Sequence, residues 1–139
     1  MVQDGLPRRI GPSNDSGRMD VFRLFALANC DTCRRAVQWL RAQGILFEER
    51  AIRETPPSVA ELRRGLAAVD GQVGRICNTS GREYRAEKLG ERLPGMTTAA
   101  ALELLAGNGS LVKRPFLVGK GVVLVGFNET AWTAALAKR

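Results

Sequence analysis

The sequence predicts an α/β domain with a mixed four-stranded sheet and a helical insert, and three observations support this prediction. An apolar run at Val21–Leu27, a segment with helical period and a second apolar run follow one another, which is typical of a β-α-β unit. Two apolar runs near the C-terminus, separated by Gly119-Lys120-Gly121, predict a β-hairpin followed by a helix. The stretch between these two halves has helical period, which predicts the insert.

In the first half, the β-branched and aromatic content of Val21–Leu27 favours a buried strand. A helix is predicted over about Asp31 to Gln43, with Gly44 as a left-handed C-terminal cap. Its apolar face has the spacing i, i+3, i+4 and i+7 and consists of Cys33, Ala36, Val37 and Leu40. A second strand is predicted from Ile45-Leu46-Phe47 and Ala51-Ile52, parallel to the first through a right-handed crossover.

The insert begins after Pro56-Pro57 with a capping box, in which Ser58 and Glu61 each satisfy a free backbone N–H. The buried face of this helix is expected to consist of Leu62, Leu66 and Val69. A turn-rich segment, 71–82, contains Cys77. Two further helical stretches are predicted at 85–91 and 98–106, the second ending at Gly107.

In the second half, the predicted strands are 115–118 and 122–125. Asn128 is a good N-cap for a final helix, Glu129 suits its positive end, and Lys138 and Arg139 suit its negative end. Trp132 and Leu136 are expected to form its buried face. The complete order, β-α-β, helices, then β-β-α, is the order of a thioredoxin-like domain.

Length and composition predict one globular domain, since 139 residues with 45% hydrophobic and 25% charged residues are ordinary for a soluble fold. Residues 1–18 are rich in Gly, Pro, Ser, Asn and Asp, so we expect a flexible extension, with residues 19–139 forming the domain. No apolar run is long enough for a membrane helix, and no signal peptide is apparent. Three cysteines also do not form a secreted disulfide framework. We therefore expect a cytoplasmic protein, monomeric and without membrane contact.

The chain has no histidine. This excludes Ser–His and Cys–His catalysis and histidine-bound zinc, and three thiols without histidine would need a carboxylate as the fourth ligand of a structural zinc site. We expect neither a metal nor a bound organic cofactor. The net charge of +7 fits either a solvated basic surface or binding of anions. The basic residues are scattered without interleaved aromatic residues, so direct nucleic-acid binding is not expected.

The chemistry is concentrated at Cys30 and Cys33. A cysteine at a helix N-terminus faces unpaired N–H groups and the positive end of the helix dipole, both of which stabilise a thiolate. Arg34 and Arg35, in the first turn, are expected to add to this effect. Cys33 has two open interpretations: a thiol that displaces a substrate from Cys30, or a packed core residue. Cys77 is interpreted mainly as a core thiol, with a resolving role as the alternative.

Arg114-Pro115 forms a second candidate element. A proline that opens a strand just after an arginine predicts a cis peptide facing the cysteine loop, and the planar arginine fork suits an oxyanion or a carboxylate. The alternative is a trans turn proline beside a solvated arginine. Asn78-Thr79-Ser80-Gly81 is a turn signal and a candidate polar loop near the site.

Across Val21 to Leu136 the sequence resembles the arsenate-reductase-like branch of the thioredoxin superfamily. This branch includes the glutathione-linked arsenate reductases (ArsC), the Spx transcriptional regulators and the YffB-like group. The resemblance rests on four motifs: Asn29-Cys30-Asp31-Thr32-Cys33, Pro56-Pro57-Ser58 with Glu61-Leu62, Lys113-Arg114-Pro115, and Leu124-Val125-Gly126-Phe127-Asn128-Glu129. It implies that Cys30 is the nucleophile and that Arg114 binds an oxyanion.

The departures from arsenate reductases concern two of their three arginines around the cysteine. Asn78 and Gly126 stand where the second and third would fall. Each lost charged hydrogen bond to a desolvated oxyanion costs about 1.5–3 kcal/mol, which argues against arsenate as the substrate. The motifs Asn29-Cys30-Asp31-Thr32 and Asn78-Thr79 are most similar to the YffB-like group.

The resemblance to that group implies a glutathione-dependent thiol–disulfide reductase. Its catalytic residues would be Cys30 and Cys33, and its partners glutathione or glutaredoxin and an anionic or disulfide substrate. The expected substrate-binding residues are Asn29, Thr32, Arg34, Asn78, Arg114 and Pro115. The alternatives are an Spx-like redox-sensing regulator that binds RNA polymerase, or an arsenate reductase proper.

Overall fold

The computed structural model describes residues 21–136. The predicted extension at 1–18, the domain start at residue 19, and the roles of Lys138 and Arg139 lie outside this range. The elements follow the predicted order, with 3₁₀ helices labelled η: β1 Phe22–Ala26, α1 Asp31–Ala42, β2 Phe47–Ala51, α2 Val59–Ala68, η1 Val73–Ile76, α3 Arg82–Ala86, α4 Leu89–Arg92, η2 Leu93–Gly95, α5 Thr98–Ala106, η3 Gly109–Leu111, β3 Phe116–Gly119, β4 Val122–Val125, α6 Glu129–Leu136.

The four strands form one mixed sheet in the order β2-β1-β3-β4. Strand β1 pairs parallel with β2, with Phe22 opposite Phe47. It pairs antiparallel with β3, with Leu24 opposite Leu117, and β3 pairs antiparallel with β4. This arrangement confirms the predicted thioredoxin-like sheet and the parallel β-α-β unit.

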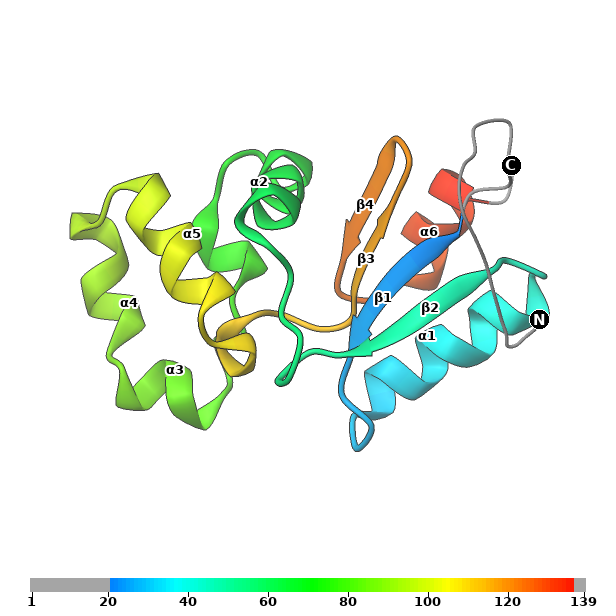
Figure 1. Ribbon diagram of the computed structural model, residues 1–139, viewed down its shortest axis with the longest axis horizontal. Helices are drawn as coiled ribbons and strands as arrows, with labels where there is room; N and C mark the ends of the chain where they lie inside the picture. Colours follow the sequence, from blue (N-terminus) through cyan, green and yellow to red (C-terminus); the bar gives the residue numbers. More distant parts are fainter. Residues whose placement is uncertain (1–20, 137–139) are drawn as a thin grey trace.

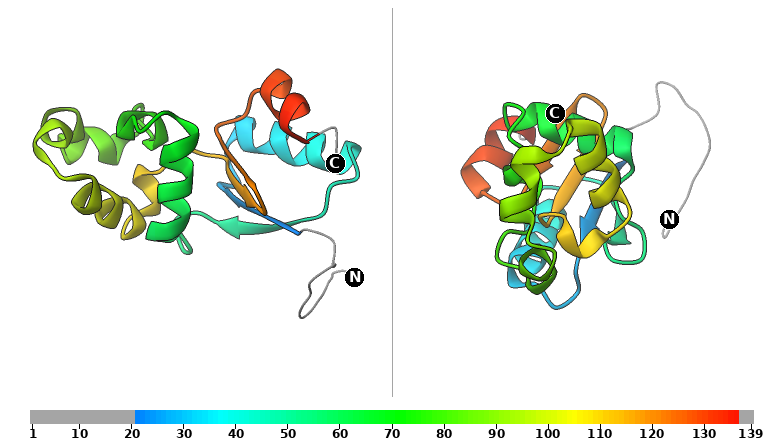
Figure 2. Two further views of the ribbon diagram at one scale, coloured as in Figure 1. Left: turned by 90° about the horizontal axis from the view of Figure 1, so that it is seen from above. Right: turned by 90° about the vertical axis from the view of Figure 1, so that its left-hand side faces the viewer.

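The sheet separates two hydrophobic cores because side chains along a strand alternate between its faces. Helices α1 and α6 lie together on one face, and α2 with the other insert helices gathers beyond the other (Figures 1 and 2). On β1, Leu24 packs in the core with α1 and α6, whereas Phe25 packs in the core of the insert. On β3, Leu117 packs in the core with α1 and α6, and Phe116 packs in the core of the insert.

The main departure from prediction is in the insert. The helix predicted at 85–91 is instead two short helices, α3 and α4, because Lys88 between them adopts a left-handed conformation with φ of 53°. The break allows Leu89, the next residue, to be fully buried in the insert core. Elsewhere the shifts are small: β2 begins at Phe47 instead of Ile45, and Gly44 has the predicted positive φ, 72°.

The predicted capping box at the start of α2 is present. The Ser58 hydroxyl accepts a hydrogen bond from the Glu61 N–H, and the Glu61 carboxylate accepts one from the Ser58 N–H. Glu61 also pairs with Arg23 of β1, which fixes the start of α2 against the sheet.

Replacing Ser58 with alanine is expected to lower the free energy of unfolding by about 1 kcal/mol, because the Glu61 N–H loses its acceptor. The measurement is urea denaturation. Ser80→Ala, at an exposed turn serine, is the matched control and should stay within about 0.5 kcal/mol of the parent. Equal stabilities of the two variants would contradict the role of this cap.

Candidate active site

Cys30 is the N-cap of α1, in extended conformation with φ of −106° and ψ of 119°. Its Sγ accepts a hydrogen bond from the Cys33 N–H at 3.4 Å. Burial raises the pKa of Cys30. This effect is outweighed by hydrogen bonds from the Cys33 N–H, the Cys33 thiol and the Thr32 N–H and by the charge of the Arg114 guanidinium, so the net pKa lies below the ordinary value. The side chain remains partly exposed, so the thiolate is accessible to a reactant.

The other two cysteines differ from Cys30 in both exposure and pKa. Cys33 is 2% exposed, and burial, then the hydrogen bond and negative charge of Cys30, raise its pKa to about 12. The Leu27 N–H donates to its Sγ at 3.5 Å. Cys77 is also 2% exposed, and burial raises its pKa to about 11. Of the three thiols, Cys30 is therefore the one that combines a lowered pKa with access.

Arg114 and Asn78 meet at one backbone carbonyl. The Arg114 Nη1 donates to the carbonyl oxygens of Ser110 and Val112, each at 3.3 Å, and the Asn78 Nδ2 donates to the same Ser110 oxygen at 3.4 Å. The Asn78 N–H donates to the Leu111 carbonyl oxygen and the Lys113 N–H donates to that of Ile76, which joins segment 76–78 to segment 111–113. Backbone carbonyl oxygens thus hold one nitrogen of the Arg114 guanidinium, and the positive charge of this guanidinium lowers the pKa of Cys30.

The remaining predicted site residues fall into two groups. Thr32 and Pro115 support the site: Thr32 contributes its N–H to Cys30, and the Arg114–Pro115 peptide is cis, as predicted. Asn29 is exposed in the turn before α1. Arg34 donates to the Ala28 carbonyl oxygen and pairs with Asp31. The guanidinium charge that lowers the pKa of Cys30 comes from Arg114 and not, as predicted, from Arg34.

Gly126, where an arginine would stand in an arsenate reductase, is covered by Lys113. Its φ is 72°, and a Cβ at this position would lie 2.8 Å from the Lys113 Cε. The Gly126 N–H donates to the Pro115 carbonyl oxygen at 2.8 Å, next to the cis peptide. A larger residue would be strained here and would displace the lysine.

Sequence reasoning missed Ser110, whose carbonyl links Asn78 and Arg114. The Asn108 Oδ1 accepts from the Ser110 N–H at 3.1 Å, and the Asn108 Nδ2 donates to Glu83 at 2.8 Å. Asn108-Gly109 is a turn signal that would have predicted the local conformation. It would not have predicted the contact with Asn78, since that contact depends on how η3 packs.

Within residues 21–136, no group of cysteine and carboxylate side chains is arranged to hold a metal ion. Over the same residues, no helix is both long and apolar enough to cross a membrane.

The fold and the cysteine at the start of α1 define a thioredoxin-like protein with a candidate thiol-based site. Residues 25–135 match the ArsC family, and the chain belongs to this family. It is 41% identical over 100 residues to YusI of Bacillus subtilis, covering 72% of this chain and 85% of YusI. It is 30% identical over 118 residues to the global transcriptional regulator Spx of Streptococcus agalactiae, covering 85% of each chain.

Solved structures agree with this assignment. An ArsC-family-related protein from Bacteroides fragilis superimposes with a TM-score of 0.75 at 37% identity, over 81% of this chain and 95% of that protein. The YffB protein superimposes with a TM-score of 0.69 at 30% identity, over 84% and 99% of the two chains. The chain is therefore arsenate-reductase-like in both sequence and fold.

Proposed function

We propose that the protein is a glutathione-dependent thiol–disulfide reductase with Cys30 as its nucleophile. The observation that supports this most is the contrast among the three thiols. Cys30 has a lowered pKa and is accessible, whereas Cys33 and Cys77 are buried with raised pKa values. In this proposal Arg114 holds an anionic group of the substrate or of glutathione beside Cys30.

The reaction proceeds by thiol–disulfide exchange. The Cys30 thiolate attacks one sulfur of a substrate disulfide, which forms a mixed disulfide and releases the other sulfur as a thiolate. A first glutathione thiolate displaces the bound substrate thiol and leaves Cys30 joined to glutathione. A second glutathione attacks that bond, which releases oxidised glutathione and regenerates the Cys30 thiolate. Two glutathione molecules thus supply the two electrons.

Glutathione is favoured over Cys33 as the resolving thiol because of the state of Cys33. With a pKa near 12, Cys33 carries almost no thiolate at neutral pH, and only a thiolate attacks a disulfide. Its N–H serves instead as a hydrogen-bond donor that stabilises Cys30.

The pH dependence of alkylation tests the state of Cys30. We expect its rate with iodoacetamide to rise with pH and to level off at a midpoint below the ordinary cysteine value, since only the thiolate reacts. Cys33 and Cys77 should react far more slowly throughout the neutral range. The measurement is peptide mass spectrometry after timed alkylation at several pH values. A Cys30 midpoint near about 8.5 would contradict the proposal.

A second candidate is a redox-sensing regulator that binds RNA polymerase. It is favoured by the 30% identity to a protein named global transcriptional regulator Spx, over 85% of each chain. Under this alternative, a Cys30–Cys33 disulfide would control binding. A pull-down of RNA polymerase with reduced and oxidised protein, run beside a glutathione-coupled turnover assay, separates the two functions.

Arsenate reduction is the least supported alternative. Arg114 supplies one guanidinium, but Asn78 is hydrogen-bonded to Ser110 and Gly126 is covered by the side chain of Lys113. The site therefore lacks two of the three arginines that the resemblance associates with this reaction.

A further inference from the structure

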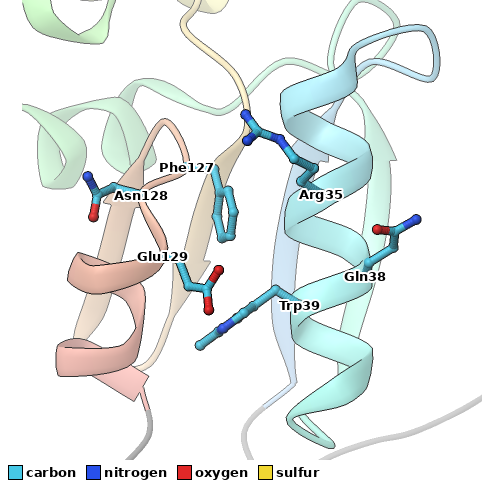
Figure 3. A pocket seen from close by; sticks show the side chains of 6 residues that line it. All are labelled: Arg35, Gln38, Trp39, Phe127, Asn128 and Glu129. Atoms are coloured by element: carbon cyan, nitrogen blue, oxygen red, sulfur yellow. The ribbon is translucent and has the colours of Figure 1, made fainter.

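A groove between α1 and the start of α6 contains two charged side chains that the proposed mechanism does not use. Its volume is about 520 Å³. Figure 3 shows Arg35 at one end of the gap, Glu129 further along it, and the rings of Phe127 and Trp39 beside them. The remaining lining residues, Gln38 and Asn128, point away from the gap in this view.

The two charged side chains of this groove, Arg35 and Glu129, have no ion-pair partner in the part of the chain that the structure describes. Among residues 21–136, the ion pairs are Arg23–Glu61, Arg34–Asp31, Arg50–Glu48 and Arg92–Glu87, so neither Arg35 nor Glu129 is paired there.

Trp39 gives a second, independent indication of a ligand. Trp39 is only 9% exposed as a whole residue, yet its indole N–H has no hydrogen-bond acceptor within residues 21–136. The neighbouring Trp132, by contrast, donates to the Gly126 carbonyl oxygen at 3.0 Å. A buried donor without an acceptor is costly, so the Trp39 N–H favours a ligand that brings one.

The groove lies within reach of a molecule attached to Cys30. Arg35 is five residues further along α1, which corresponds to about 7.5 Å along the helix axis. An extended tripeptide spans about 10 Å. A thiol of tripeptide size, joined to Cys30 through sulfur, can therefore place one end between Arg35 and Glu129.

We propose that this groove binds the zwitterionic amino-acid end of the thiol that reduces Cys30, an inference that rests on the proposed function. The Arg35 guanidinium binds the α-carboxylate, and the Glu129 carboxylate accepts hydrogen bonds from the α-ammonium. The Trp39 N–H donates to an oxygen of the same ligand, and the rings of Trp39 and Phe127 cover its methylene groups. A ligand with one charge alone leaves Arg35 or Glu129 without a partner.

The test measures rate constants for thiolate exchange of Cys30 with three disulfides. These are glutathione disulfide, the same molecule with both amines acetylated, and the uncharged bis(2-hydroxyethyl) disulfide. Arg35→Gln and Glu129→Gln are each expected to lower the rate ratio of glutathione disulfide to the uncharged disulfide by about fivefold, as for a partly exposed ion pair. With the acetylated disulfide, Arg35→Gln should keep its effect and Glu129→Gln should lose it.

The controls are Arg41→Gln in the last turn of α1 and Glu103→Gln on α5, both exposed residues outside the groove. Each control changes the net charge by the same amount as the groove variant of the same residue type. It should therefore leave the rate ratio of glutathione disulfide to the uncharged disulfide unchanged if binding depends on the groove. A rate ratio equal to that of the parent in all four variants would overturn the groove proposal while leaving the function of Cys30 intact. Failure of parent Cys30 to exchange with any of the disulfides would instead overturn the proposed function.

Discussion

Replacement of Cys30 with serine is expected to reduce glutathione-coupled disulfide turnover at least about a thousandfold, because a hydroxyl is not ionised at neutral pH and forms no disulfide. The N-cap position can still be satisfied by the serine oxygen, so the fold should survive. The measurement is turnover of bis(2-hydroxyethyl) disulfide in the presence of glutathione, followed through oxidised glutathione.

Two further cysteine variants complete this experiment. Cys77→Ala removes a thiol of the insert core and should keep turnover, provided that circular dichroism shows a folded protein. Cys33→Ala leaves the N–H that donates to Cys30 in place, so glutathione can still resolve the mixed disulfide. A loss of more than tenfold in Cys33→Ala would assign resolution to Cys33, and residual turnover in Cys30→Ser close to that of the parent would reject Cys30 as the nucleophile.

Replacement of Gly109 with alanine is expected to lower the free energy of unfolding by about 3 kcal/mol. A Cβ at Gly109 would lie 1.8 Å from the Ile52 carbonyl oxygen and 2.7 Å from its carbonyl carbon, both backbone atoms that cannot rotate away. Either η3 or the end of β2 must therefore move, which is the cost of overpacking a buried site. Chemical denaturation measures the effect.

Gly74→Ala is the matched control for Gly109→Ala, since Gly74 is exposed in η1 and a Cβ there meets no atom within 4 Å. It should change stability by no more than about 0.5 kcal/mol. The Gly109 variant also has an expected effect on the site. Because Ser110 follows Gly109 and its carbonyl holds Arg114, a shifted η3 moves the guanidinium, and the pKa of Cys30 should rise. Similar stabilities of the two variants would contradict this account.

Local patterns predicted the elements because their causes are local. The i, i+3, i+4 spacing of α1, the Ser58–Glu61 capping box and the Gly119-Lys120-Gly121 turn each depend on residues within one or two turns of chain. The split of the helix predicted at 85–91 depends instead on burying Leu89 among residues distant in sequence. No local pattern contains that information.

For the candidate site, sequence alone determined the position of Cys30 at a helix start, because an N-cap is set by the few residues around it. It also marked Arg114-Pro115 as a strand-opening pair. Only the tertiary structure decided which cation acts on the thiol and which of three cysteines is accessible. Arg34, near in sequence, pairs with Asp31, while Arg114 influences Cys30 because β3 lies beside β1. Burial and long-range electrostatics depend on the packing of the whole chain, and that packing separates one accessible thiolate from two buried thiols.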